Sequence, residues 1–242
     1  MTDIKSMLLS ELQGDFALRG LQKFRAAQVY RWLHQRGVTS FDEMTNLSKD
    51  LRVALKESFE IRNTEIAIRR VSKIDGTKKY LFRLNDGEMI ESVLMKYKHG
   101  YSICISTQVG CRMGCRFCAS AIAGFVRNLT PAEMLLQIYE TERAQNCKIS
   151  SLVLMGIGEP LDNFDNVLRF LQLLSDPNGY GMSLRHVTVS TCGVVPKILE
   201  LAEQRLGLTL SVSLHCPNDA GRSAIMPINR SYPIDVLLDA CQ

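Results

Sequence analysis

The sequence predicts an α/β protein whose main domain is an open or partial (β/α) barrel. Beyond Tyr101, short apolar runs typical of strands alternate four times with stretches of helical periodicity, which implies a parallel sheet. Polar residues occupy every second position of the later strands, whereas strands of a doubly wound sheet are apolar on both faces. A curved sheet with a polar inner face explains this alternation.

The composition is that of one large globular domain, with or without an accessory domain. The 242 residues are 46% hydrophobic, and the mean hydropathy is near zero. No apolar segment is long enough to span a bilayer, and the first residues do not resemble a secretory signal. We therefore expect a cytoplasmic protein without a membrane partner. In such a chain, eight cysteines favour metal ligation or catalysis over disulfides.

Residues 1–62 are predicted to form a small helical module. Apolar residues recur at helical spacing over residues 24–36, a capping box at residues 40–43 opens a short helix, and another helix follows Ser48.

Basic residues are concentrated in the first part of the chain. Residues 1–100 hold 18 Lys and Arg against 13 Asp and Glu, while the remainder holds 11 against 12. This asymmetry indicates either a surface for a polyanion or an ordinary solvated surface, and charge alone does not separate the two.

Residues 63–100 are predicted to form a β-rich linker. Apolar and charged residues alternate there, and Asp75-Gly76 and Asp86-Gly87 mark tight turns. We expect two or three antiparallel strands between the helical module and the barrel.

Residues 101–242 are predicted to contain four βα units. Thr130, Pro131 and Glu133 form a clear start for the first helix. The expected strands are 102–107, 150–155, 186–191 and 208–215, and the expected helices are 131–145, 163–175, 196–204 and 233–241.

Three closely spaced cysteines carry the strongest chemical signal. Cys111, Cys115 and Cys118 follow a C-x3-C-x2-C pattern, which can hold three corners of a four-iron cluster and leave one iron open to a chelating small molecule. A structural zinc knuckle and a ferredoxin-like carrier are the alternatives. Both are less favoured, because neither a second ligand pair nor a fourth cysteine at motif spacing lies nearby.

Polar residues follow the other predicted strands at the same rim, where barrel enzymes place their chemistry. Glu159, in a glycine-rich turn, could hold the amino group of a ligand or be an exposed acid. The same ligand could be contacted by Ser190, Ser213 and His215. Alternatively, these could be barrel hydroxyls whose hydrogen bonds are satisfied within the protein and a structural histidine. Their shared position favours ligand contacts.

Two further residues have no clear role from the sequence. Glu91 is an acid in an otherwise apolar strand, which calls for a partner or a function. Cys104 is consistent with a small buried hydrophobe.

Several stretches together resemble the RlmN/Cfr family of the radical S-adenosylmethionine (SAM) superfamily. The cysteine triplet with Phe117 resembles the superfamily signature. The family-like stretches are residues 90–93 (IESV), 104–111 (CISTQVGC), 156–161 (GIGEPL), 187–196 (VTVSTCGVVP), 213–219 (SLHCPND) and 226–229 (MPIN).

The resemblance implies an enzyme that methylates adenine C2 in 23S rRNA and tRNA through a methyl-cysteine and a 5′-deoxyadenosyl radical. It implies that the helical module binds RNA, that an electron donor such as flavodoxin or ferredoxin is a partner, and that a disulfide bond forms. The resemblance implies that the 4Fe-4S cluster is held by Cys111, Cys115 and Cys118. It implies that SAM is contacted by Gly158, Glu159, Ser190, Ser213, Leu214 and His215. The implied catalytic residues are Glu91, as proton acceptor, and Cys104.

One departure from the family concerns the end of the sequence. In the family, the methyl-carrying cysteine lies beyond the last strands of a six-unit barrel, whereas this sequence ends after its fourth unit, and Cys241 is not a counterpart. We therefore expect a C-terminally truncated chain with a partial barrel. A SAM-cleaving protein without methyl transfer and a cluster-holding RNA-binding remnant stay open as alternatives.

Overall fold

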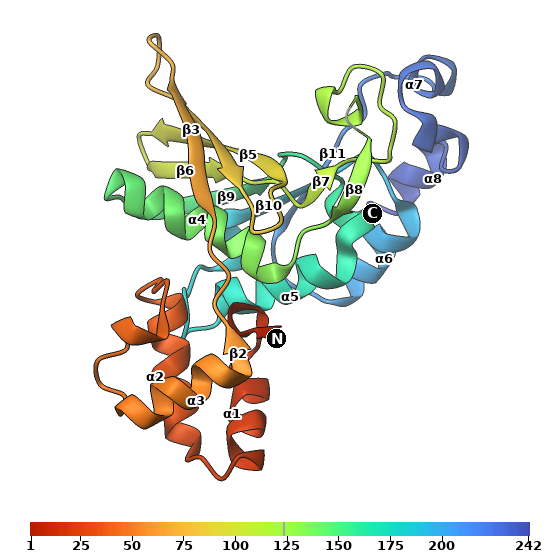
Figure 1. The fold of residues 1–242 in the computed structure, drawn as a ribbon. Helices are drawn as coiled ribbons and strands as arrows, with labels where there is room; N and C mark the ends of the chain where they lie inside the picture. Colours follow the sequence, from red (N-terminus) through yellow and green to blue (C-terminus); the bar gives the residue numbers. More distant parts are fainter. Residues whose placement is uncertain (123) are drawn as a thin grey trace.

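Seven strands form one mixed sheet with the order β11-β10-β9-β6-β5-β4-β3 (Figure 1). The computed structural model describes residues 1–122 and 124–242. Strands β6, β9, β10 and β11 are parallel, and β3, β4 and β5 continue the sheet in antiparallel fashion. The strands are Glu65–Val71 (β3), Lys78–Arg83 (β4), Met89–Tyr97 (β5), Gly100–Cys104 (β6), Ile149–Leu154 (β9), Val187–Thr191 (β10) and Thr209–Val212 (β11).

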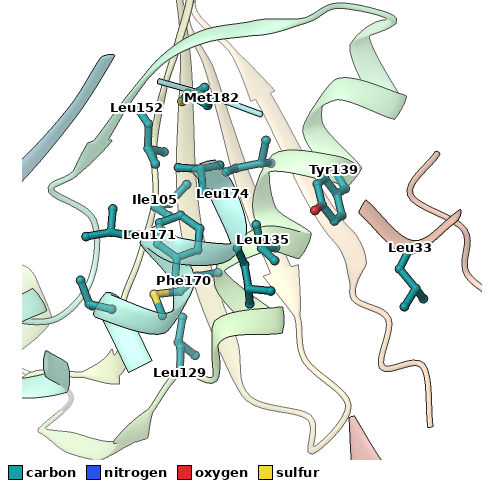
Figure 2. Packing of buried hydrophobic residues seen from close by; sticks show 14 of the residues in the cluster. Leu33, Ile105, Leu129, Leu135, Tyr139, Leu152, Phe170, Leu171, Leu174 and Met182 are labelled. Carbon is teal, nitrogen blue, oxygen red and sulfur yellow. The ribbon is translucent and has the colours of Figure 1, made fainter. Parts of the chain in front are cut away.

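Helices after the parallel strands bury one face of the sheet. They are Pro131–Gln145 (α4), Phe164–Ser175 (α5) and Val195–Glu203 (α6). Two shorter helices, Asp219–Ile225 (α7) and Ile234–Asp239 (α8), follow β11. Figure 2 shows Leu135 of α4 and Phe170, Leu171 and Leu174 of α5 packed with Leu152 of β9, all nearly fully buried. In the described part of the chain, no helix is long and apolar enough to cross a membrane.

The predicted alternation of strands and helices is confirmed, with small differences at the ends of elements. The strand expected over 208–215 ends at Val212, and the chain then turns at His215, whose φ of 60° is left-handed. The sequence does not predict α7, because its seven residues include Gly221 and Ser223 and lack apolar periodicity.

The β linker expected over 63–100 is part of the main sheet. Its last strand, β5, pairs along its length with β6, the first strand of the barrel. Ile90, Ser92 and Leu94 of β5 are buried, while Glu91 and Val93 between them are half-buried. The linker therefore widens the sheet by three strands.

The N-terminal module contains the three helices Leu9–Leu18 (α1), Lys23–His34 (α2) and Lys49–Ser58 (α3). The predicted capping box is present, with the Ser40 backbone N–H donating to Glu43 Oε1 at 2.9 Å. Helix α1 is not predicted by the sequence, because Gly14 lies in its interior and only Leu12 and Phe16 are buried.

A buried polar contact joins this module to the main domain. The Nδ1 atom of His34 on α2 lies 3.0 Å from the hydroxyl of Tyr139 on α4. His34 is 1% exposed, and its Nε2 has no hydrogen-bond partner among the described residues. Burial, followed by the positive charge of Lys5, lowers the pKa of His34 from 6.5 to about 3.

Acidification is expected to destabilise this interface. Below pH 6.5, His34 becomes protonated in the unfolded chain but stays neutral in the folded chain. Because the unfolded state then binds the additional proton, a lower pH favours unfolding. The free energy of unfolding should fall by up to about 3 kcal/mol between pH 6.5 and about pH 4. Urea unfolding at both pH values should show that a His34→Gln variant loses most of this dependence. An unchanged dependence would contradict the assignment.

Candidate functional site

A cavity of about 330 Å³ lies at the C-terminal ends of the parallel strands. Its walls come from the cysteine loop after β6, the turn after β9, the ends of β10 and β11, and the segment before α7. It is lined by Cys111, Met113, Cys115, Phe117, Cys118, Leu154, Met155, Gly156, Gly158, Glu159, Ser190, Thr191, Cys192, Ser211, Ser213, His215 and Met226.

Backbone contacts fix the cysteine loop at both ends. A short hairpin of Gln108–Gly110 (β7) and Phe125–Asn128 (β8) brackets the loop, and the Cys111 N–H donates to the carbonyl of Gly124 at 3.0 Å. On the far side, the Arg116 N–H donates to the carbonyl of Ile225 at 2.9 Å, which ties the loop to the end of α7.

The three cysteines of the motif face this one cavity. Burial raises the pKa of Cys111, and it raises that of Cys115 to about 11, with further contributions from the neighbouring thiols and Glu159. Positive charge from a bound metal would be needed to hold these groups as thiolates.

Three thiols around one open cavity suit an iron–sulfur cluster. Among the described residues, no three His, Cys, Asp or Glu side chains lie close enough together to hold one metal ion. An iron–sulfur cluster holds its thiolates at the corners of a larger unit. Three thiols around an open cavity fit such a unit, with room left for a small molecule.

Glu159 is a buried carboxylate on the cavity wall and not an exposed turn acid. It is 4% exposed, and burial raises its pKa. Its Oε2 accepts from the Cys192 N–H at 2.8 Å, and its Oε1 accepts from the Leu161 N–H at 3.0 Å. These two backbone bonds hold the carboxylate in one orientation beside the thiols.

Two glycines let the turn after β9 approach its neighbours closely. Gly158 has a φ of 106°, and a Cβ there would lie 2.6 Å from Gln108 Cβ. A Cβ on Gly156 would lie 2.6 Å from the backbone of Ile105. A side chain at either position would force the turn that carries Glu159, or its neighbours, to shift.

Of the four residues predicted to contact SAM from the later strands, three line the same cavity. Ser190, Ser213 and His215 line it, and the His215 ring packs on Phe117 with centroids 4.4 Å apart. Leu214 is half-buried and is not among the lining residues.

Several site residues are missing from the sequence prediction. Ser211 could have been found, since it shares the alternation that identifies Ser213. Arg222 carries no such signal. It is fully buried and donates to the carbonyl of Cys192 at 2.6 Å and to Asn229 Oδ1 at 2.7 Å, which fastens α7 to the rim.

Cys104 and Glu91 lie beside the cavity and not in its wall. Cys104 is half-buried at the end of β6, and burial raises the pKa of its thiol. Glu91 forms an ion pair with Lys79 at 2.8 Å. Val93 pairs directly with Cys104, and Glu91 lies two residues before Val93 in the same strand. The side chains of Glu91 and Cys104 therefore lie on the same face of the sheet.

The disulfide bond implied by the family resemblance is not formed. All eight cysteines are free.

A partial barrel with three cysteines at its rim is the arrangement described above, and residues 105–242, which form most of it, match the family model of the Radical SAM superfamily. The chain belongs to that superfamily. Residues 1–61 match the "Ribosomal RNA large subunit methyltransferase N-terminal domain".

Similar proteins narrow the assignment. A "Probable dual-specificity RNA methyltransferase RlmN" of Lachnospira eligens is 53% identical over all 242 residues, which cover 69% of its length. A protein of the same description from Clostridium novyi is 49% identical over all 242 residues, which cover 71% of its length. A radical SAM methyltransferase from Sphaerobacter thermophilus superimposes with a TM-score of 0.92 and 38% identity, over 100% of this chain and 72% of that one. Within the superfamily, the chain belongs to the RlmN family.

Proposed function

We propose that this protein is an RNA methyltransferase that methylates adenine C2 in 23S rRNA and tRNA. Its cofactors are a 4Fe-4S cluster and SAM. The observation that carries the proposal is that three thiols and a buried carboxylate surround one cavity at the barrel rim. A reduced cluster held by these thiols would supply an electron to bound SAM, and such radical chemistry can modify a carbon that is not nucleophilic.

The chain's own residues bind and orient these cofactors. We assign Cys111, Cys115 and Cys118 as cluster ligands. The fixed carboxylate of Glu159 lies near them and suits the cationic amino group of SAM.

The remaining rim residues are assigned to the rest of SAM. The hydroxyls of Ser190 and Ser213 offer donors and acceptors for its ribose or carboxylate, and Gly158 lines the wall beside them. Leu214, which lies between Ser213 and His215 in the chain, is assigned to SAM through its backbone. His215, whose ring packs at a tilt against Phe117, lines one side of the cavity and is assigned to the same cofactor.

Two residues outside the cavity are assigned to the RNA base. The thiol of Cys104 contacts the backbone of Met155, which lines the cavity, and we assign it to assist release of the methylated base. Glu91 is assigned as the proton acceptor, and Lys79 holds its carboxylate on the face that carries Cys104.

The partners follow from this activity. RNA is the substrate, and an electron donor such as flavodoxin or ferredoxin would reduce the cluster. Because ribosomal and transfer RNA are cytoplasmic, we place the activity in the cytoplasm. The helical module, which matches a ribosomal RNA methyltransferase domain, is assigned to RNA binding.

The test is methyl transfer by the anaerobically reconstituted chain. The chain is incubated with SAM, a reductant, and 23S rRNA fragments or tRNA, and nuclease digests are analysed by mass spectrometry. Formation of 2-methyladenosine would support the proposal. Formation of 5′-deoxyadenosine without methylated RNA would instead support a SAM-cleaving protein. Absence of both products would support a cluster-holding RNA-binding protein.

A further inference from the structure

The strongest concentration of positive charge lies on the β3–β4 hairpin. Residues 65–83 contain six Lys and Arg against two Asp and Glu, a balance equal to the formal net charge of +4 of the whole chain. Residues 1–62, the helical module, hold ten against eight. The tip of the hairpin projects well beyond the rest of the sheet (Figure 1). The basic excess of the first hundred residues therefore belongs mainly to the hairpin.

One row of directly paired residues connects this hairpin to the functional site. Neighbours in the row are paired across every strand of the main sheet, so their side chains point to the same face. From the hairpin edge inward, the row is Arg70, Lys79, Val93, Cys104, Val153, Thr188 and Thr209.

This row marks the accessible face of the sheet, which we call the open face. All seven of its members are half-buried or exposed. The adjacent row contains Leu94, Ile103, Leu152 and Val187, which are at most 2% exposed and belong to the core. The open face therefore runs without a break from Cys104 to the basic edge.

The cations on the open face differ in their availability. Lys79 is already paired with Glu91 at 2.8 Å. Arg70 is exposed and forms no ion pair with any described residue. Arg69, its neighbour in β3, pairs with Tyr80, whose side chain is buried in the core, so Arg69 lies on the opposite face.

We propose that the open face over β3 and β4 binds RNA phosphates next to the target adenine, with Arg70 as the principal contact. This inference rests on the proposed function for its ligand class. An enzyme that acts on a base draws that base out of its stack, and the flanking backbone must then be held outside the cavity. Arginine suits that role because its guanidinium pairs with phosphate in bidentate geometry.

The distances across the sheet agree with this role. Strands lie about 4.8 Å apart, so Lys79 and Arg70 are about 10 and 14 Å from Cys104. A helical strand of nucleic acid rises about 3.4 Å per nucleotide, so these cations match phosphates within about four nucleotides of the base. The backbone would thus cross the sheet from the cavity mouth to its basic edge.

Charge on an edge strand has a second possible purpose, which is to prevent pairing between copies of the sheet. The two arginines separate these explanations. Arg69→Gln and Arg70→Gln remove the same charge from adjacent positions of the same strand, but only Arg70 is on the open face. Lys79 is a poorer probe, because its loss would also disturb Glu91.

The test is binding of a fluorescently labelled RNA stem-loop with an unpaired adenine, measured by anisotropy over a range of salt concentrations. Arg70→Gln should weaken binding roughly three- to tenfold and reduce the salt slope by about 0.7. Arg69→Gln should bind like the parent chain. Both variants should match the parent in thermal unfolding and in RNA-independent formation of 5′-deoxyadenosine.

This binding assay does not require methyl transfer, so it is independent of the proposed activity. Selective loss in Arg70→Gln supports the inference even if the chain leaves RNA unmethylated. Equal losses in both variants, a larger loss in Arg69→Gln, or no loss in either would overturn it.

Discussion

Replacing Cys115 with alanine is expected to abolish cluster binding and, with it, cleavage of SAM. The cavity offers three thiols of the motif, and a cluster left with two thiolates has a second open corner. Substitutions of residues that merely support metal ligands cost 10–100-fold in affinity or activity, so loss of a ligand should cost more than about 100-fold. Iron and sulfide content after anaerobic reconstitution, with the visible absorbance of the cluster, provides the measurement.

A matched control comes from Cys241, which is exposed near the end of α8 and outside the cavity wall. Cys241→Ala should retain the parent's iron and sulfide. If Cys115→Ala still binds a complete cluster and forms 5′-deoxyadenosine, the three-thiol assignment is wrong.

The second large effect is expected from Glu159→Gln, which should weaken SAM binding about 10- to 100-fold. The substitution keeps the size of the side chain but removes the negative charge assigned to the SAM amino group. It also replaces one acceptor oxygen with an N–H₂ group, so the N–H of either Cys192 or Leu161 would face another donor. That mismatch should reduce the free energy of unfolding by about 1–3 kcal/mol.

Equilibrium dialysis of SAM against the reconstituted chain measures the first effect, and urea unfolding measures the second. Glu203→Gln, at the exposed end of α6, makes the same chemical change away from the cavity and should alter neither quantity. Unchanged SAM affinity in Glu159→Gln would show that this carboxylate supports the rim without contacting the cofactor.

Features set by local spacing could be predicted from the sequence. Helix α4 has the predicted bounds of 131–145, because Thr130, Pro131 and Glu133 form a capping box with proline at the first helical position. The cysteine loop and Glu159 meet at one cavity because the ends of parallel strands share one rim. The alternation in β10 and β11 correctly indicated that Ser190 and Ser213 face inward.

Features set by contacts between distant residues could not be predicted. Cys104 lies on the same face as Lys79 and Arg70 only because β5 and β6 pair in one particular register. Arg222 supports the rim through the carbonyl of Cys192, thirty residues away in the chain. Similarly, Glu91 meets Lys79 only once the strands that carry them have paired.

The most direct test of the account is the amount of 5′-deoxyadenosine formed from SAM by the reconstituted and reduced chain, measured beside its metal content. The account predicts iron and sulfide in the ratio of a 4Fe-4S cluster, and 5′-deoxyadenosine that depends on both reductant and Cys115. A chain that retains only zinc, or a complete cluster that leaves SAM intact after reduction, would contradict a radical SAM centre in this cavity.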